Sequence, residues 1–276
     1  MHNAAFRELG LNWRYLAYDV HPEDLPQALK GARAMGFLGL NLTVPHKLLA
    51  LPLVDELDES ARKCGAVNTI LFEARVAAGE WKPLAEVEMP RAQRIRLRGF
   101  NTDADAVVQS IQEDLEMNLA GKRVLILGAG GAGRVAALKL ASAGVAELFL
   151  VNRSEEKSRA ILQEIRQLVP ALKTNLGYPP GQVDLLLNAT SLGLKADDPL
   201  PVSESNFSLS QALAVYDMIY RPAKTRLLER AEKAGCRIAN GLGMLLYQGA
   251  KALEIWTGKI APIELMRSAL EKNIYG

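Results

Sequence analysis

The segment from Val124 to Leu140, VLILGAGGAGRVAALKL, most constrains what this chain can fold into. It begins with four apolar residues typical of a β-strand, continues with Gly128, Gly130 and Gly133 in G-x-G-x-x-G spacing, and ends with apolar residues at helical spacing. A strand, a glycine loop and a helix in this order are typical of a dinucleotide site, because the loop lets backbone N–H groups approach a pyrophosphate. A strand–turn–helix whose glycines serve geometry alone is the alternative, and the flanking elements favour the nucleotide site.

Length and composition limit the possible protein classes. The chain has 276 residues, 49% of them apolar, and a formal net charge of +2. This predicts one large or two smaller domains and favours neither nucleic-acid binding nor an acidic tail. Cys64, Cys236 and the histidines are scattered, so we expect a reducing cytoplasm, no disulfide framework and no metal site. No apolar run approaches the roughly 20 residues of a membrane span, so we expect no membrane partner.

The second half of the chain predicts a parallel sheet. Apolar segments that alternate with helical ones form strands buried on both faces. We predict strands at Leu148–Val151, Val183–Thr190, Leu213–Tyr220 and Arg237–Ala239, with helices at Ser154–Leu168 and Ala223–Ala234. The last two helices, Gly243–Trp256 and Pro262–Ile274, have no strand between them, and we expect them to pack on the first half.

The first hundred residues predict a mixed α/β unit. Strands are expected at Trp13–Val20, Phe37–Val44, Ala66–Glu73 and Ile95–Phe100, and helices at Glu23–Met35, from His46, and at Glu56–Lys63. Arg94, Arg96 and Arg98 would share one strand face, which we interpret as a solvated sheet edge. The predicted fold is therefore a two-domain α/β protein. Residues 1–103 and 239–276 would form a mixed α/β domain, and residues 104–238 a Rossmann-type domain.

The end of the second strand of the nucleotide unit indicates which cofactor is bound. A protein that prefers NAD usually places Asp or Glu here for the ribose 2′-hydroxyl. This chain has Asn152, followed by Arg153, Ser154 and Lys157. Two cations at a helix N-terminus suit a 2′-phosphate, so the segment predicts NADP. A solvent-facing basic helix start is the alternative.

Polar side chains near three strand ends are candidates for chemistry. Lys47 follows NLTVPH, in which Asn41 and Thr43 alternate onto one face, Asp103 ends GFNTD, and Asn68 belongs to GAVNT. Ligands of open α/β sheets collect at the carboxyl ends of strands, so these groups could converge there. Each also has a structural alternative, the asparagines as hydrogen-bonding groups at strand ends and Asp103 as a helix N-cap.

The chain resembles the shikimate dehydrogenase family over essentially its whole length. The motifs that carry this resemblance, in order, are NLTVPHK, GAVNT, GFNTDA, GAGGAG, VNRS, LNATSLG, YDMIY and GLGMLLYQGA. The resemblance implies a substrate domain and a Rossmann-type NADP domain in a monomer or homodimer. It also implies reversible hydride transfer between NADPH and 3-dehydroshikimate, giving shikimate for aromatic amino acid biosynthesis. A close relative in this family also accepts quinate and tolerates NAD.

The resemblance also implies residue roles. Lys47 and Asp103 would be the catalytic pair. The substrate-binding positions would be Asn41, Thr43, Asn68, Tyr220 and Gln248. The pyrophosphate loop would be Gly128, Ala129, Gly130, Gly131 and Ala132. The adenosine phosphate would be held by Asn152, Arg153, Ser154 and Lys157, and the nicotinamide end would be lined by Thr190, Met218 and Gly241.

One departure from the family pattern leaves alternatives open. The family normally begins with a strand and an S-x-S-P loop whose serines bind the substrate carboxylate, and the given sequence begins after both. A truncated, weakly active or non-catalytic dinucleotide-binding relative is therefore the alternative. Another cyclic hydroxy-acid oxidoreductase of the same fold is a third possibility. The set Lys47, Asn68, Asp103 and Gln248 favours an enzyme, because a binding protein would not need all four.

Overall fold

The computed structural model describes residues 1–76, 79–87 and 94–276. These residues form two compact units. Unit 1 comprises Met1–Asp103 and Leu246–Asn273, and unit 2 comprises Ala104–Leu245 and Ile274–Gly276. Throughout the described residues, every helix is too short or too polar to cross a lipid bilayer.

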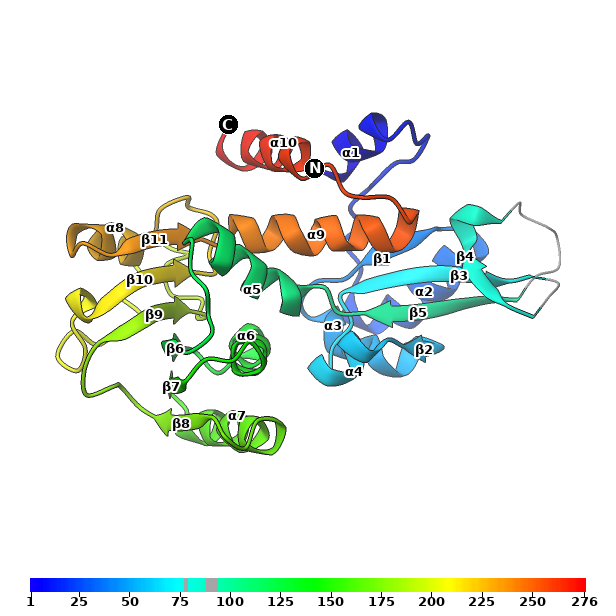
Figure 1. Ribbon diagram of the computed structural model, residues 1–276. Helices are drawn as coiled ribbons and strands as arrows, with labels where there is room; N and C mark the ends of the chain where they lie inside the picture. The colour runs from blue at the N-terminus through cyan, green and yellow to red at the C-terminus, as the bar shows by residue number, and fades with distance from the viewer. Residues whose placement is uncertain (77–78, 88–93) are drawn as a thin grey trace. The chain divides into compact units, whose positions relative to one another are not determined.

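Unit 2 contains a six-stranded sheet in the order β11-β10-β9-β6-β7-β8, and every pair is parallel. This is the doubly wound order of dinucleotide-binding folds, and it confirms the predicted parallel sheet (Figure 1). The strands are β6 (Arg123–Leu127), β7 (Glu147–Val151), β8 (Lys173–Leu176), β9 (Val183–Asn188), β10 (Ala212–Asp217) and β11 (Arg237–Asn240). The sequence did not predict β8, a short polar strand at the sheet edge that pairs only with β7.

Helices cover both faces of this sheet because successive strand residues point to opposite sides. On one face, Ile126 packs in a core that includes Leu140 and Ile161. On the other, Leu127 packs in a core that includes Leu227 and Leu228. The helices are α5 (Asp103–Asp114), α6 (Gly131–Ser142), α7 (Glu155–Leu168) and α8 (Arg226–Lys233), with a 3-10 turn η4 (Leu209–Gln211).

Unit 1 is the predicted mixed α/β unit, and its sheet contains both parallel and antiparallel pairs. Its longest strand, β3 (Thr69–Arg75), is antiparallel to β1 (Gly39–Asn41), β4 (Trp81–Pro83) and β5 (Ile95–Phe100), and β2 (Glu56–Leu57) is parallel to β5. The connecting helices are α2 (Leu25–Ala34), α3 (His46–Leu49) and α4 (Glu59–Cys64), with 3-10 turns η1 (Pro22–Asp24), η2 (Leu51–Leu53) and η3 (Leu84–Glu86).

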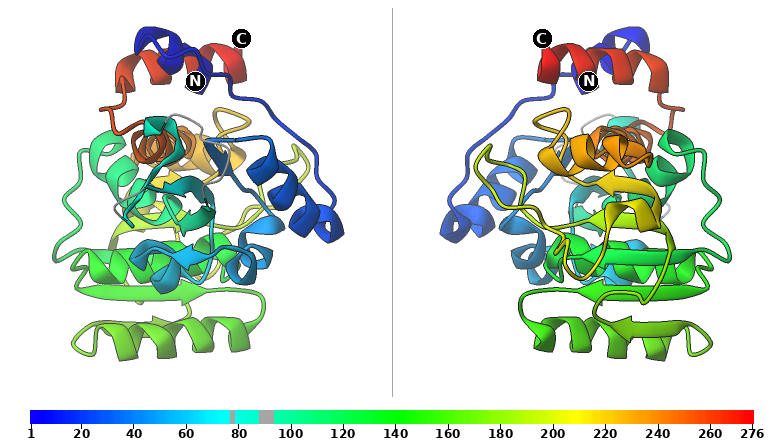
Figure 2. Two further views of the ribbon diagram at one scale, coloured as in Figure 1. Left: turned by 90° about the vertical axis from the view of Figure 1, so that its right-hand side faces the viewer. Right: turned by 90° about the vertical axis from the view of Figure 1, so that its left-hand side faces the viewer.

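The last helices complete unit 1. Trp256 of α9 (Leu242–Thr257) packs on Leu71, and its indole N–H donates to the Ile70 carbonyl at 3.0 Å. A Cβ atom at Gly39 would lie 2.1 Å from the indole nitrogen, so only glycine leaves room for this ring. Helix α10 (Ile263–Tyr275) lies beside α1 (His2–Glu8) in Figures 1 and 2. The expectation that these helices pack on the first half is confirmed.

The strand predicted at Trp13–Val20 is wrong, because this segment is extended without strand pairing. The Asn3 side chain supplies the hydrogen bonds that a neighbouring strand would make. Its amide nitrogen donates to the Tyr15 carbonyl at 2.9 Å, and its oxygen accepts from the Tyr15 N–H at 2.7 Å. The β-forming composition of the segment therefore reflects aromatic packing, with the Tyr15 ring stacked on His2 at 4.4 Å between centroids.

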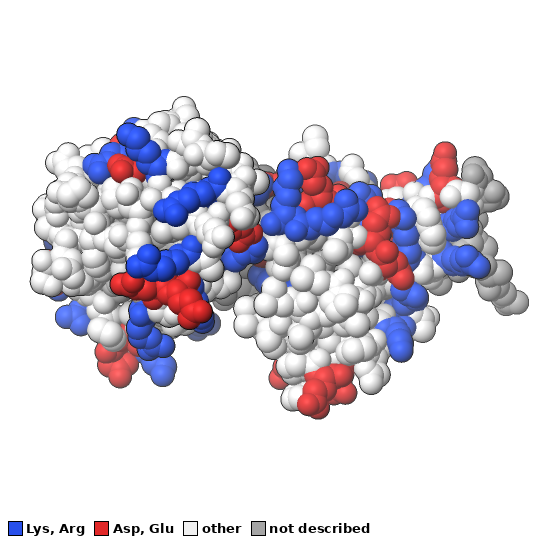
Figure 3. All heavy atoms as spheres, turned by 90° about the horizontal axis from the view of Figure 1, so that it is seen from below, with Lys and Arg blue, Asp and Glu red and all other residues white. Residues whose placement is uncertain are grey.

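The interpretation of the arginines as a solvated edge is also wrong, because β5 lies between β3 and β2. Arg96 is paired with Glu56 and, at 2.7 Å, with Glu73, whose side chain is only 6% exposed. Arg98 pairs with Asp58 at 3.1 Å. These arginines compensate carboxylates that are partly or largely removed from water. On the face seen in Figure 3, basic and acidic atoms likewise lie beside one another.

Candidate active site

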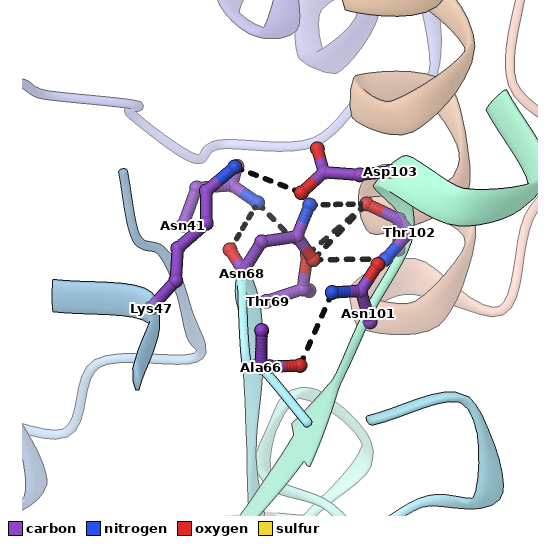
Figure 4. Close-up of polar contacts among 8 residues, drawn as sticks. All are labelled: Asn41, Lys47, Ala66, Asn68, Thr69, Asn101, Thr102 and Asp103. Atoms are coloured by element: carbon purple, nitrogen blue, oxygen red, sulfur yellow. Dashed lines mark hydrogen bonds and ion pairs between the residues drawn. The ribbon is translucent and has the colours of Figure 1, made fainter. Parts of the chain in front are cut away.

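Lys47 and Asp103 form an ion pair in unit 1. Lys47 lies in α3, shortly after β1, and Asp103 is the first residue of α5, after β5. The Lys47 Nζ atom donates to Asp103 Oδ2 at 2.8 Å, and the side chains are 28% and 13% exposed (Figure 4). Among the described residues, Asp103 is the only hydrogen-bond partner of the lysine amine, and Asp103 Oδ1 accepts no hydrogen bond. Lys47 can therefore still donate a hydrogen bond to a ligand, and Asp103 Oδ1 can still accept one.

The mixed sheet explains why these residues meet. Asn41 at the end of β1 is opposite Thr69 at the start of β3, and Thr69 is opposite Phe100 at the end of β5. Residues that follow β1 and β5 therefore lie beside residues that precede β3. The sequence predicted that these polar groups could converge at one edge of the sheet. Asn41 and Asp103 lie at or after the carboxyl ends of β1 and β5, whereas Asn68 precedes the amino end of β3, because β3 is antiparallel to both.

Asn68 connects the strands beneath the ion pair. It is 1% exposed, and its Oδ1 atom accepts from the Thr102 N–H at 2.9 Å and from the Thr69 hydroxyl at 3.0 Å. Its Nδ2 atom donates to the Thr102 hydroxyl at 3.0 Å, which uses one of the two amide N–H groups. The sequence analysis did not assign a role to Thr102, although it directly precedes Asp103. Asn68 and Thr102 together fix the segment that carries the carboxylate.

Asn41 is also engaged within the protein. Its Oδ1 atom accepts from the Tyr15 hydroxyl at 3.0 Å, and its Nδ2 atom donates to the Thr69 hydroxyl at 3.0 Å and the Asn68 carbonyl at 3.3 Å. Burial raises the pKa of Tyr15, which keeps this hydroxyl a protonated donor. A ligand at Asn41 would therefore meet a side chain already oriented by its neighbours.

The remaining predicted substrate positions are more dispersed. Thr43 is exposed beyond β1, and Gln248 is half-buried in the part of α9 that belongs to unit 1. Tyr220 belongs to unit 2, where it follows β10 and is 37% exposed.

The glycines of the G-x-G-x-x-G segment in unit 2 are of two kinds. Gly128 has a φ of +106°, and a Cβ atom at Gly133 would lie 2.1 Å from the Gly128 carbonyl oxygen, so the fold itself requires both glycines. Gly130 and Gly131 are exposed, and a Cβ atom at either would meet no atom of the described residues within 4 Å. Gly130 also has an ordinary φ of −79°. The protein alone does not require glycine at these positions, whereas a pyrophosphate at the start of α6 would fill this space.

The residues after β7 hydrogen-bond to the glycine loop and include two exposed basic side chains. Asn152 accepts from the Ala129 N–H at 3.2 Å and donates to the Ser154 carbonyl at 2.9 Å, so it braces the glycine loop. The Ser154 side chain makes no capping hydrogen bond with α7. Arg153 and Lys157 are exposed and have no ion-pair partner within the described part of the chain. This arrangement fits a bound phosphate group.

The predicted nicotinamide residues follow β9, β10 and β11, which are adjacent strands. The Thr190 hydroxyl donates to Asn188 at 2.8 Å, and Asn188 donates to Asp217 at 2.9 Å. Burial raises the pKa of Asp217, although hydrogen bonds to the carboxylate oppose the shift. A Cβ atom at Gly241 would lie 2.1 Å from the Met218 carbonyl oxygen, so these two backbone segments are in close contact. The sequence analysis did not identify Asn188 or Asp217.

The fold and these sites define the class of a dinucleotide-binding α/β oxidoreductase. Three family models match the chain: the shikimate dehydrogenase substrate binding domain over residues 1–70, shikimate / quinate 5-dehydrogenase over residues 108–192, and the shikimate 5′-dehydrogenase C-terminal domain over residues 241–271. A shikimate dehydrogenase (NADP(+)) of Methanopyrus kandleri is 39% identical over 99% of this chain and 90% of its own length. The chain belongs to the shikimate dehydrogenase family.

Two solved structures show how far the likeness extends. Shikimate 5-dehydrogenase from Thermus thermophilus, in complex with NADP(H) and shikimate, is 34% identical with a TM-score of 0.78, and the match covers 98% of this chain and 92% of that one. The ligand-free 5-ketofructose reductase of Gluconobacter sp. strain CHM43 is also 34% identical, with a TM-score of 0.79, and the match covers 98% and 91%. Chains of this similarity therefore include enzymes named for different substrates.

Proposed function

We propose that this chain is an NADP-dependent enzyme that interconverts shikimate and 3-dehydroshikimate. The observation that carries the proposal is the Lys47–Asp103 ion pair, which lies at the polar end of the unit 1 sheet with capacity for a ligand on both side chains. Membership of the family and the NADP-dependent relatives support the same activity. A weakly active or non-catalytic relative would have no use for this pair.

The chemistry follows from the two side chains. Bound NADPH supplies the hydride. As the ketone of the substrate is reduced, negative charge develops on its oxygen, and a protonated Lys47 amine stabilises that charge and donates the proton. Asp103 Oδ2 holds the amine, while Oδ1 accepts a hydrogen bond from a neighbouring substrate hydroxyl. In the oxidation direction the same lysine, unprotonated, accepts the proton of the hydroxyl.

The remaining proposed roles are assigned within each unit separately. In unit 1, Asn68 would offer its second N–H group to a substrate hydroxyl, with Asn41, Thr43 and Gln248 as further substrate contacts. In unit 2, Tyr220 is a further proposed substrate-binding residue. The open space at Gly130 and Gly131 would receive the pyrophosphate. Arg153 and Lys157 would hold the 2′-phosphate and so favour NADP over NAD. Thr190, Met218 and Gly241 would line the nicotinamide end.

Reduction of 5-ketofructose is a second candidate, favoured by the equal identity of the reductase from Gluconobacter. Oxidation of quinate is a third, since one family model covers shikimate and quinate 5-dehydrogenases together. All three reactions interconvert a ketone and an alcohol on a polyhydroxylated substrate, so the ion pair serves each. The substrates differ in the carboxylate, which shikimate and quinate carry and 5-ketofructose lacks.

Steady-state assays test the proposal. Shikimate and quinate are each supplied with NADP⁺ or NAD⁺, and 5-ketofructose with NADPH. The shikimate–NADP⁺ pair is expected to give the highest kcat/KM. In Lys47→Ala, kcat should fall by about two to four orders of magnitude, the contribution of general acid–base catalysis, with the affinity for NADP⁺ unchanged.

Lys63→Ala is the matched control, because Lys63 forms an exposed i,i+4 ion pair with Glu59 at 2.6 Å in the same unit. It should keep the wild-type kcat. Normal turnover in Lys47→Ala, or no reduction of NADP⁺ by shikimate or quinate despite cofactor binding, would contradict the proposal.

We further propose that the protein works in the cytoplasm as a monomer or homodimer. Both cysteines are buried, and neither forms a disulfide within the described part of the chain, which suits a reducing compartment. Light scattering after size-exclusion chromatography would decide between the two oligomeric states.

A further inference from the structure

Residues 218–223 form the loop that follows β10. The side chains of Asn240 and Tyr275, which lie outside this loop, hold its backbone in place. The Tyr275 hydroxyl donates to the Tyr220 carbonyl at 2.8 Å. The Asn240 amide donates to the Ala223 carbonyl at 2.7 Å and to the Tyr275 hydroxyl at 3.0 Å. All these groups belong to unit 2. Consecutive parts of the loop are therefore fixed through carbonyl oxygens.

Asn240 also fixes the neighbouring backbone. It is the last residue of β11, and its Oδ1 atom accepts from the N–H of Leu242, the first residue of α9, at 2.9 Å. Between them, Gly241 donates to the Ile219 carbonyl at 3.2 Å and lies against the Met218 carbonyl. One amide side chain thus joins the end of a strand, the start of a helix and the loop.

The other end of the loop is anchored from β10. The buried Asp217 carboxylate accepts from the Ile219 N–H at 3.1 Å and from the Thr225 hydroxyl at 2.6 Å. The Tyr220 ring, by contrast, is 37% exposed, and its hydroxyl has no hydrogen-bond partner among the described residues. The loop therefore combines a fixed backbone with a side chain that remains available to a ligand.

We propose that Asn240 and Tyr275 are positioning residues for hydride transfer. They are not among the residues proposed to contact substrate or cofactor. They act by holding the backbone of Met218 and Tyr220, which are proposed for the nicotinamide end and the substrate, so the inference rests on the function proposed above. A displacement of about 1 Å in such a part can cost up to about 100-fold in rate. The loss of one of several anchors therefore lowers the rate while the protein stays folded.

The test is Tyr275→Phe in the full-length chain, which removes only the hydroxyl. With shikimate and NADP⁺, kcat should fall about five-fold. The dissociation constant for NADP⁺ should stay unchanged, because the phosphate contacts lie elsewhere on unit 2. The primary isotope effect, measured with shikimate deuterated at the oxidised carbon, should increase as hydride transfer becomes slower than product release. Asn240→Ala should act in the same direction and more strongly, since it removes the hydrogen bonds to the Ala223 carbonyl, the Tyr275 hydroxyl and the Leu242 N–H.

Tyr18→Phe is the matched control. It deletes the hydroxyl of an exposed tyrosine that has no hydrogen-bond partner among the described residues, and its rate and isotope effect should equal those of the wild type. A fall in kcat without a larger isotope effect in Tyr275→Phe would show a smaller folded fraction rather than lost positioning, and would overturn the proposal.

Hydrogen exchange separates this inference from the proposed function. Amides of residues 218–225 should exchange faster in Tyr275→Phe and Asn240→Ala, with those of β10 unchanged. Unchanged exchange overturns the positioning role whatever the substrate. If the wild-type chain does not oxidise shikimate, the proposed function fails instead. The isotope effect is then measured with whichever substrate of the panel is turned over.

Discussion

His2 is a histidine that the fold keeps neutral. Its side chain is 5% exposed, stacks on Tyr15 and shares a hydrogen bond of 3.1 Å with the Gly249 carbonyl through Nε2. Burial lowers the pKa of His2 to about 4 from its ordinary value of 6.5. Protonation of His2 therefore opposes folding.

This shift predicts a pH-dependent stability. Between pH 6.5 and about 4 the unfolded chain binds a proton that the folded chain does not, so the free energy of unfolding falls as the pH is lowered. The loss through His2 is about 3 kcal/mol across the window, at 1.36 kcal/mol per pKa unit. Urea denaturation at pH 7, 5.5 and 4.5 measures it. His2→Gln, which keeps an N–H donor but does not titrate, should show a smaller decrease, and equal decreases in the two proteins would refute the assignment.

The amide side chains show which parts of the candidate site the sequence could predict. Motifs identified Asn41 and Asn68 as candidate substrate contacts and, alternatively, as hydrogen-bonding groups at strand ends. They could not indicate the partners Tyr15 and Thr102, because these residues come from other parts of the chain. The proximity of Lys47 and Asp103 depends on strand direction, which residue spacing does not specify.

At the scale of elements, Gly130 directly before α6 and Gly133 in its first turn differ in their surroundings. Gly133 allows the helix to approach the Gly128 carbonyl, whereas Gly130 borders open space. Gly130 and Gly133 are only three residues apart, so the same substitution at each position compares the two surroundings directly.

Gly133→Ala should destabilise the protein by about 1–3 kcal/mol, the usual cost of overpacking, because its Cβ atom would lie 2.1 Å from a carbonyl oxygen. Gly130→Ala should leave the free energy of unfolding unchanged and weaken NADP⁺ binding, because the added methyl group occupies the space proposed for pyrophosphate. Chemical denaturation and NADP⁺ titration measure the two effects. Equal NADP⁺ affinity in Gly130→Ala and wild type would count against that location.

Two errors in the strand predictions have different physical causes. In Trp13–Val20, β-forming residues were present, but the partner was the Asn3 side chain rather than a strand. In β8, the segment Lys173–Leu176 lacks the apolar run that marks the buried strands, because it lies at the sheet edge. Strands inside the sheet, such as β6 and β9, were predicted because burial on both faces requires a nearly continuous run of apolar residues.

At the scale of the whole molecule, a preference for NADP over NAD should appear as a difference in melting temperature between the two complexes. A ligand that binds only the folded chain stabilises it by about 2.7 kcal/mol at 100 times its dissociation constant. NADP⁺ should therefore raise the melting temperature more than NAD⁺ at equal concentration. The double variant Arg153→Ala/Lys157→Ala should remove this difference.

Arg159→Ala is the control, because Arg159 lies on α7, as Lys157 does, but pairs with Glu155 at 3.2 Å. It should keep the preference for NADP⁺. An undiminished preference in the double variant would show that other groups recognise the 2′-phosphate.

Unit 1 combines residues from distant parts of the chain, since Gly39 and Trp256 meet at one contact. Synthesis must therefore reach Trp256 before the interior of this unit can be completed. The same contact restricts which substitutions evolution can accept. A residue larger than glycine fits at position 39 only if Trp256 has first been replaced by a smaller residue, so we expect the two positions to change in that order or not at all.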